Sequence, residues 1–573
     1  MKTMANRSRL YATQLIAALL LVACGGGGGG GGGGTTPPSG GGGGGSTPTY
    51  TVSAVVTGLS GSLVLQDNGG NNLAVSGNGT VSFTTKLASG ATYAVTVLTQ
   101  PTGLKCTVAS GSGTVAKANV TVSVSCAALV NYWTWISGSN AINGQPTYGT
   151  PGVAAAGNTP GARYFASTWT DASGNLWLFG GGGYDSTGTI GKLNDLWKYS
   201  NGQWTWVSGG NTNIANNTGT FAAVVGTPSP TNAPGARTGA ATWVDASNNL
   251  WMFGGLGFDD GTNTSSSTPA NTIGLNDLWM FNGTEWTWMG GSSAGGASGN
   301  YGTQSVSSST NIPGARYSPS TWFDGSGNLW LFGGSGYDSG ANIGLLNDLW
   351  KFDGTNWTWV SGSETISGET ASYGTLGTPS SMNMPGGRYV AASWIDISTG
   401  TLWLFGGNQL YGGGLIAPVA NDLWTYNTTT GLWTWVGGSS TSNASGNYGT
   451  MGVAAASNVP GARFAANTWV DATGRFWLFG GEGFDSAGND QYLNDLWVYT
   501  GGQWTWVGGQ NTINAHGNYG TMGVANFAND PGARAGASAW VDSTGKVGLF
   551  GGFGIDANGG NSYLNDLWKF AQH

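Results

Sequence analysis

Two charged residues recur six times each along most of this 573-residue chain. An arginine ends every Pro-Gly-(Ala/Gly)-Arg motif, and an aspartate is second in every Asn-Asp-Leu-Trp motif. Unpaired charges are seldom tolerated inside proteins, so we predict structural bridges within each repeat. The alternative is an arginine ring that binds an acidic sugar. The residues are Arg163, Arg237, Arg316, Arg388, Arg463 and Arg534, with Asp195, Asp277, Asp348, Asp422, Asp495 and Asp566.

A second recurring group is Gly-(Tyr/Phe/Ile)-Asp, which is present in every repeat except the fourth. An aromatic ring beside a carboxylate suits a sugar, which can stack on the ring and donate its hydroxyls to the carboxylate. Such an aspartate can equally cap its own turn. Carboxylate oxygens also bind Ca²⁺, but no compact run of alternating acidic ligands occurs. The candidate ligand-binding residues are Tyr184, Asp185, Phe258, Asp259, Tyr337, Asp338, Phe484, Asp485 and Asp556.

The composition excludes several kinds of chemistry. Three cysteines and two histidines cannot supply a Cys/His zinc, haem or copper-radical site. We therefore predict no metal and no cofactor. A formal net charge of −8 argues against a phosphate-binding surface, so we expect no nucleic-acid partner. Glu482 and Glu364 are candidate catalytic acids, but each occurs in a single repeat, which favours solvated surface residues.

The recurring motifs lie on a repeated β unit. Each unit predicts four antiparallel strands, which in the first are residues 163–170, 176–179, 194–199 and 204–207. One four-stranded sheet cannot bury both faces alone, whereas six sheets arranged radially can. The region opens with Trp133-Thr134-Trp135 and closes with Asn-Asp-Leu-Trp at 565–568. We therefore expect the first strand to complete the last blade and to close the ring.

These units resemble kelch repeats, with an Arg near the start, paired glycines in Phe-Gly-Gly, and a Trp near the end. They are longer than ordinary kelch repeats and also carry Trp-Thr-Trp and Asn-Asp-Leu-Trp. The resemblance implies an all-β fold with a six-bladed kelch-type β-propeller over residues 129–573. Similar propellers include galactose oxidase, whose copper site has no counterpart here, and the exported sialic-acid mutarotases, which need only an acid/base pair near the channel.

Strand direction places two kinds of connection on one face of the propeller. In the first blade these are residues 182–193 and about 208–234, whereas the opposite face has only tight turns. Recognition is usually built on long loops over a rigid scaffold. Tyr-Gly-Thr triplets recur midway in the inter-blade connections, with Thr218 at the Tyr position of the second unit. We expect them to hold each connection on its blade, although exposed rings there could also form a recognition surface.

The N-terminus has the features of an export signal. Lys2, Arg7 and Arg9 precede an apolar run too short to span a membrane, which predicts a signal peptide over residues 1–23. Leu21-Val22-Ala23-Cys24 resembles the lipobox of bacterial lipoproteins, which implies that Cys24 is a lipid anchor. Residues 24–49 form a Gly-rich tether. Gly25 differs from the Asp of inner-membrane retention signals, so we expect a cell-envelope protein on the outer membrane or cell surface.

Residues 50–128 predict a small β-sandwich domain, because β-prone runs alternate with Asn/Gly turns. Cys106 and Cys126 lie near the ends of its last strands in an exported chain, and we predict a disulfide between them. No clustered polar group marks a site, so a spacer role is expected.

Together these features predict an exported, lipid-anchored kelch-repeat protein that binds a glycan or another protein through its long-loop face, without catalysis. The alternative is a non-metal carbohydrate-active enzyme such as a sugar mutarotase. An enzyme would concentrate unusual polar residues in one or two blades around the channel. The motifs instead make the blades nearly equivalent.

Overall fold

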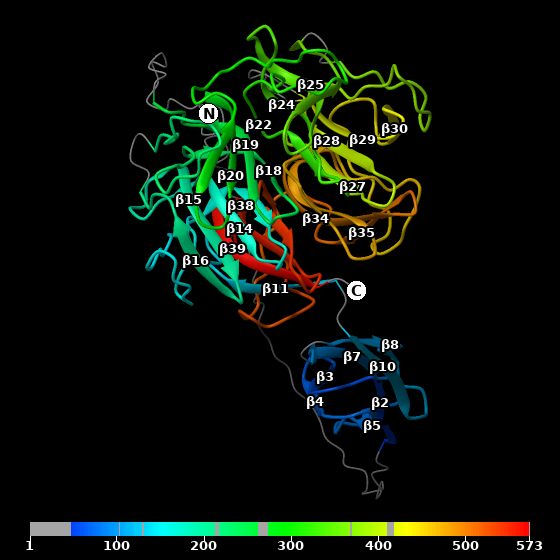
Figure 1. The fold of residues 1–573 in the computed structure, drawn as a ribbon. Helices are drawn as coiled ribbons and strands as arrows, with labels where there is room; N and C mark the ends of the chain where they lie inside the picture. Colours follow the sequence, from blue (N-terminus) through cyan, green and yellow to red (C-terminus); the bar gives the residue numbers. More distant parts are fainter. Residues whose placement is uncertain are drawn as a thin grey trace, which may run out of the picture. The chain divides into compact units, whose positions relative to one another are not determined.

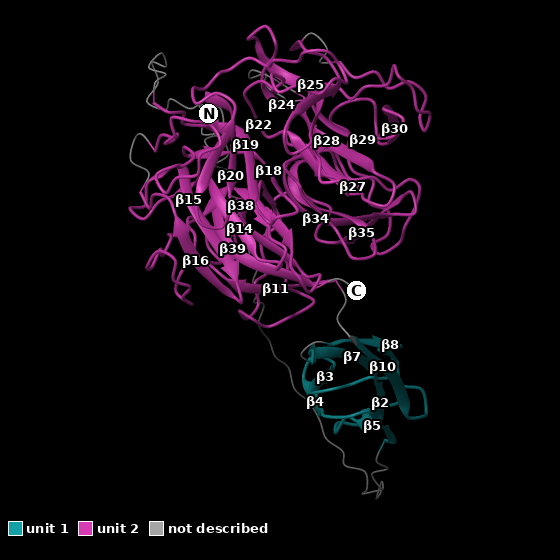
Figure 2. Cartoon of the chain, viewed as in Figure 1, with its two compact units in different colours: residues 1–127 teal, residues 128–573 magenta. Residues whose placement is uncertain are grey.

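The computed structural model describes residues 47–101, 104–128, 131–212, 217–261, 273–366, 370–409 and 418–571. The predicted signal peptide, Cys24 and most of the tether lie outside these residues. The chain forms two compact units that divide between Ala127 and Ala128 (Figure 2). No helix in the described part of the chain is both long and apolar enough to cross a membrane. The described secondary structure is all-β.

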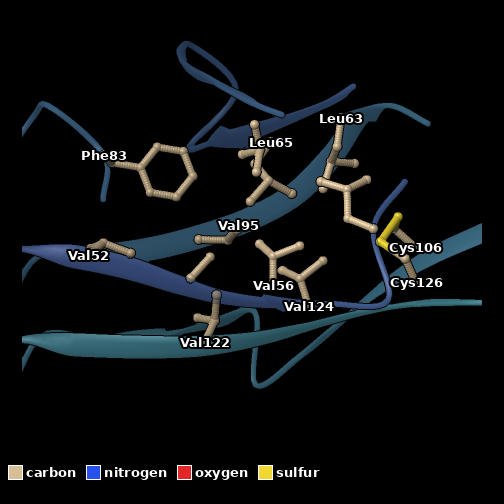
Figure 3. Packing of buried hydrophobic residues seen from close by; sticks show 13 residues of the cluster. Val52, Val56, Leu63, Leu65, Phe83, Val95, Cys106, Val122, Val124 and Cys126 are labelled. Atoms are coloured by element: carbon tan, nitrogen blue, oxygen red, sulfur yellow. A yellow bond between two sulfur atoms is a disulfide. The ribbon is translucent and has the colours of Figure 1, made fainter. Parts of the chain in front are cut away.

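The first unit contains two four-stranded sheets and one short strand pair. Alternate residues of its strands point inward, as Val52, Ala54 and Val56 do, and meet residues such as Leu65 in one hydrophobic core (Figure 3). The sheet orders are β5-β2-β10-β8, β4-β3-β7-β9 and β1-β6. The strands are β1 (Thr49–Tyr50), β2 (Val52–Thr57), β3 (Leu63–Asp67), β4 (Asn71–Val75), β5 (Gly79–Ser82), β6 (Leu87–Ala88), β7 (Thr92–Thr99), β8 (Leu104–Ala109), β9 (Ser112–Thr114) and β10 (Val120–Ala128).

The predicted disulfide is confirmed: Cys106 on β8 bonds to Cys126 on β10. Both cysteines are buried at one end of the core (Figure 3). The bond therefore joins adjacent strands of one sheet beneath the apolar side chains of the other.

The second unit contains six sheets that follow one another in chain order (Figure 1). Sheets 1, 2, 3 and 5 each have five strands, in which a broken first strand pairs with the second. Their strands are β12 (Arg163–Tyr164), β13 (Ser167–Thr170), β14 (Leu176–Tyr184), β15 (Ile190–Ser200) and β16 (Gln203–Ser208); β17 (Arg237–Thr238), β18 (Ala241–Val244), β19 (Leu250–Gly257), β20 (Ile273–Phe281) and β21 (Trp286–Gly290); β22 (Arg316–Tyr317), β23 (Ser320–Phe323), β24 (Leu329–Tyr337), β25 (Ile343–Phe352) and β26 (Trp357–Ser361); and β31 (Arg463–Phe464), β32 (Asn467–Val470), β33 (Phe476–Phe484), β34 (Asp490–Thr500) and β35 (Gln503–Gly508).

Sheet 4 has four strands, and sheet 6 combines the two ends of the unit. In sheet 6, β11 pairs antiparallel with β39, so that Trp133 lies opposite Phe570 and Trp135 opposite Trp568. This confirms that the first strand completes the last sheet. The remaining strands are β27 (Ala392–Asp396), β28 (Thr401–Asn408), β29 (Val419–Asn427) and β30 (Leu432–Gly437) in sheet 4, and β36 (Arg534–Ala535), β37 (Ser538–Val541), β38 (Val547–Ile555), β39 (Asn561–Ala571) and β11 (Tyr132–Ser137) in sheet 6.

A cycle of six backbone hydrogen bonds links the sheets. In each sheet the residue two positions after the repeat Arg donates its N–H to its counterpart in the preceding sheet, and sheet 1 donates to sheet 6. The N···O distances are 2.6 to 3.0 Å, and φ at all six residues lies between 49° and 65°. We call this cycle the hydrogen-bonded ring. Its members are Phe165, Gly239, Ser318, Val390, Ala465 and Gly536.

The paired glycines bring neighbouring sheets into close contact. A Cβ at Gly180 would lie 2.6 Å from the Leu193 carbonyl oxygen and 2.8 Å from that of Arg237 in the next sheet. The same contact recurs around the unit, and Gly551 of sheet 6 packs against the Arg163 carbonyl of sheet 1. Only glycine fits there, since φ is also positive at these positions.

The extent of the long loop predicted at 182–193 is wrong. Strand β14 continues to Tyr184 and β15 begins at Ile190, which leaves a five-residue turn. The glycines that suggested a loop pair with β15 across a bulge between Phe179 and Gly181. The inter-sheet connections are hydrogen-bonded to the outer strands of the sheets. The Gly152 N–H, for example, donates to the Trp206 carbonyl of the outer strand β16, and the other sheets repeat this bond. Each connection thus covers an outer strand edge.

The disulfide predicts a simple chemical result. Alkylation of the denatured chain without reductant should leave the masses of peptides containing Cys106 and Cys126 unmodified, and reduction should expose both thiols. Because the bond closes a loop with a sequence separation of 20, changing both cysteines to Ser should destabilise the first unit by about 3 kcal/mol, measurable by urea unfolding. Alkylation of either cysteine before reduction would contradict the assignment.

Candidate functional site

Each of the six repeat arginines forms a buried bidentate ion pair with the repeat aspartate of its own sheet. The Nη–Oδ distances are 2.6 to 2.9 Å. In sheet 3, Arg316 also donates from Nε to the Gly314 carbonyl and from Nη1 to the Gly333 carbonyl. The guanidinium therefore fixes the backbone just before β22 and within β24, as well as the carboxylate.

The aspartate of each pair also accepts a hydrogen bond from the indole of the Trp two residues later. Asp348 Oδ2 accepts from Trp350 Nε1 at 2.7 Å and from the Tyr301 hydroxyl at 2.6 Å. Burial opposes charge on Arg316, but the Asp348 carboxylate outweighs it and raises the pKa of the guanidinium. The six arginines are at most 1% exposed. The alternative of an arginine ring that binds an acidic sugar is therefore wrong.

The tyrosines of the Tyr-Gly-Thr triplets complete these networks. Five hydroxyls, from Tyr148, Tyr301, Tyr373, Tyr448 and Tyr519, donate to the repeat aspartates at 2.6 to 2.9 Å.

The residue predicted at the Tyr position of the second repeat, Thr218, is wrong. Phe221, not Thr218, occupies the Tyr position there, and its ring packs against Trp279 and Trp288 at 4.9 and 5.2 Å. Asp277 consequently has no phenol donor at that position.

The five Gly-x-Asp aspartates are not open ligand groups. They are at most 4% exposed, and each accepts the backbone N–H two residues later. Asp338 Oδ1 accepts from the Gly340 and Asn342 N–H groups, and its Oδ2 accepts from Ile366 in the next connection. Asp185, Asp259, Asp338, Asp485 and Asp556 thus cap their own turns, which corrects their assignment as ligand-binding residues.

The aromatic partners of these aspartates are less accessible than predicted. Tyr184, Phe258 and Tyr337 are half-buried, and Phe484 is buried. Within the described residues, no three His, Cys, Asp or Glu side chains group closely enough to hold a metal ion. Glu364 is exposed on a connection.

A different set of residues breaks the repeat. In each sheet, one residue lies between the repeat Arg and the member of the hydrogen-bonded ring. It pairs across the sheet with a residue of the second strand, and that residue pairs in turn with a residue of the third strand. We call these eighteen residues the axial cluster. They are Tyr164, Gly182 and Lys192; Thr238, Leu256 and Gly274; Tyr317, Ser335 and Leu345; Tyr389, Asn408 and Val419; Phe464, Glu482 and Tyr492; and Ala535, Phe553 and Tyr563.

The axial cluster contains packed but half-buried aromatic rings. Tyr563 lies between Tyr164 and Phe553, with ring centroids at 5.4 and 5.1 Å. Phe553 also contacts Tyr492 at 5.8 Å, so these rings join sheets 5, 6 and 1. On other sheets, Tyr317 and Tyr389 are 6.0 Å apart. Aromatic rings of sheets 5, 6 and 1, and of sheets 3 and 4, therefore lie beside the hydrogen-bonded ring.

One carboxylate, Glu482, lies among these rings. Burial, Tyr317 and Glu482 together raise the pKa of Tyr389 to about 12. Burial, Glu482 and Tyr164 raise that of Tyr492 further. The phenols consequently stay protonated at neutral pH and can both donate and accept hydrogen bonds. Apolar rings with a few convergent polar groups are typical of a small-molecule site.

Of the axial cluster, only Glu482 was predicted from the sequence as a candidate site residue, whereas the tyrosines and Lys192 were not. The motifs were found where the repeats agree, whereas the axial cluster occupies positions where they differ. An alignment of the six units scored for disagreement would have identified these positions. No model of a protein family matches this chain, and comparison with curated proteins finds no match either.

The ion pairs predict that Arg237→Gln strongly destabilises the second unit. The change leaves Asp277 buried with one partner lost, at a cost of about 3–5 kcal/mol, measurable by urea unfolding. Arg475→Gln is the matched control, because Arg475 bonds to Asp471 with its own side chain 29% exposed, and should cost about 1 kcal/mol or less. Equal stabilities of the two variants would overturn the structural role.

The second repeat predicts a stabilising change. Phe221→Tyr should restore the missing phenol donor to Asp277 and add about 1 kcal/mol, whereas Tyr301→Phe should remove a comparable amount. Burial and Asp348 raise the pKa of Tyr301, so the folded state keeps a proton that the unfolded state loses above pH ~10. Stability from Tyr301 therefore falls as pH rises past that value, and Tyr301→Phe should make alkaline unfolding less steep. An unchanged pH dependence would contradict this assignment.

Proposed function

We propose that the second unit is a closed, six-bladed kelch-type β-propeller. The hydrogen-bonded ring supports closure, because its six bonds return from sheet 6 to sheet 1. The contact between Gly551 and the Arg163 carbonyl supports the same arrangement. The pairing of β11 with β39 leaves no incomplete sheet at the junction.

The propeller binds a saccharide at the axial cluster, on the side of the inter-sheet connections. The observation that carries this proposal is that the axial cluster gathers half-buried tyrosines and a glutamate that differ from sheet to sheet, whereas the buried Arg and Asp are the same in all six sheets. A scaffold role predicts the same residue in every sheet, as at the Arg and Asp positions. Half-buried tyrosines around a single glutamate instead provide different groups at each position.

The chemistry of these groups favours a sugar. Aromatic faces pack against the C–H faces of a pyranose, while phenol hydroxyls and a carboxylate exchange hydrogen bonds with its hydroxyls. Glu482 lies on β33, near Tyr389 of sheet 4 and Tyr492 of its own sheet. A protein partner would need a larger surface than these residues offer.

A second candidate is a non-metal enzyme such as a sugar mutarotase. The position of Glu482 among protonated phenols favours it, because a carboxylate and a phenol can serve as general base and general acid. The enzyme would interconvert anomers without a cofactor. NMR exchange between anomers of a bound sugar separates this activity from binding alone.

The features of residues 1–49 lead us to propose where in the cell the protein is located. The signal peptide exports the chain, acylated Cys24 holds it on the cell envelope at the outer membrane or cell surface, and the Gly-rich tether separates the folded units from the lipid. The first unit acts as a spacer between tether and propeller.

A glycan array probed with the full chain in mild detergent tests the function. The wild type should bind a defined set of glycans, and the combined Tyr389→Phe and Glu482→Gln changes, which remove polar groups but little volume, should weaken binding at least about tenfold. Glu285→Gln, on the opposite-side turn between β20 and β21, should bind as the wild type does. Absence of binding by a folded wild type would overturn the saccharide proposal and favour a protein partner.

A further inference from the structure

Lys192 is the one basic residue of the axial cluster, and its side chain is almost entirely buried. It is 7% exposed. Its amine forms no hydrogen bond or ion pair with any residue in the described part of the chain. Lysine is almost never this buried unless it is paired. The undescribed segments contain a single acidic residue, Glu369.

Other lysines on the third strands have partners. Lys198 Nζ lies 3.7 Å from Asp171 Oδ2 and 4.8 Å from the Trp177 ring centroid. Lys569 donates to Asp542 at 3.2 Å, and Lys351 lies over the Trp330 ring. These side chains are oriented by carboxylates or aromatic faces. Lys192 differs from them in both burial and pairing.

Strand register places Lys192 on the same side of the sheet as Tyr164 of the axial cluster. Lys192 lies opposite Gly182, which lies opposite Tyr164, so all three project from one face. A Cβ at Gly182 would lie 2.5 Å from Tyr164 Cε1, so the tyrosine ring covers that glycine. Two strand spacings separate the backbones of Lys192 and Tyr164, about 10 Å. The lysine therefore borders the aromatic part of the axial cluster.

Burying most of a lysine side chain without a counter-ion is unfavourable in the unbound protein. Burial alone lowers the pKa of Lys192 to about 8, so the amine still carries a proton at neutral pH. The equivalent residues of sheets 3 and 4 are Leu345 and Val419, which pack there without this cost. An apolar side chain would thus suit the fold better than lysine does.

We propose that Lys192 binds an anionic group of the saccharide, such as a carboxylate or a phosphate ester. The proposal rests on the proposed function and specifies its ligand class. A bound anion supplies the counter-charge that none of the described residues provides, and Tyr164 and its neighbouring rings contact the sugar beside that charge. Neutral sugars can occupy the same site but leave the ammonium unpaired.

Calorimetric titration of the full chain in mild detergent tests the proposal. The probes are D-glucuronate, D-glucose 6-phosphate and D-glucose, so that the two anions are compared with each other and with the neutral sugar. The wild type should bind one or both anionic sugars about 10- to 100-fold more tightly than glucose. Lys192→Met should abolish this preference by weakening the binding of the anionic sugars, and Lys192→Arg should restore part of it.

Lys351→Met is the matched control, because Lys351 is also on a third strand but outside the axial cluster. It should keep the preference of the wild type. Thermal unfolding of each variant establishes that it is folded, and Lys192→Met should melt no lower than the wild type. Equal binding of charged and neutral sugars, or a preference that survives Lys192→Met, overturns the anion assignment alone. Failure of every sugar to bind overturns the proposed function together with it.

Discussion

The cycle of six backbone hydrogen bonds constrains the rest of the second unit. Each member must adopt a left-handed φ, which costs about 1–3 kcal/mol at a non-glycine residue, and four members are Phe165, Ser318, Val390 and Ala465. The buried ion pair two residues earlier offsets this strain. Arg163, for example, bonds to Asp195 and to the carbonyls of Gly161 and Gly180. These bonds fix the backbone two residues before the ring member Phe165.

This arrangement leaves the side chain between the Arg and the ring residue free to vary in each repeat. The Arg is fixed by its carboxylate, and the ring residue by its backbone bonds, whereas the residue between them contributes mainly its backbone. Tyr164, Thr238 and Ala535 occupy equivalent positions although their sizes differ greatly. A rigid scaffold with variable side chains around its axis can thus acquire a binding site with little cost to folding.

Much of the fold could be predicted because agreement among repeats reports shared structure. Arg237 and Asp277 recur with their motifs, and the end motifs identified the pairing of β11 with β39. Gly182 and Gly183 were misread as the start of a loop because a run of glycines usually marks a turn, whereas here both pair with β15 inside β14. Residue spacing alone also could not reveal that Asp338 faces Ile366.

The two charges of the axial cluster explain why an asymmetric ligand would bind in one orientation. Six equivalent sheets around an axis would offer a sugar six equal orientations, because every contact would repeat. Lys192 belongs to sheet 1 and Glu482 to sheet 5, and no other sheet carries a charge at the matching positions. In the proposed site, an anionic group bound by Lys192 would leave the hydroxyls of the same sugar to meet Glu482 and the tyrosines. Divergence of the repeats at these positions would therefore give the proposed site a defined direction.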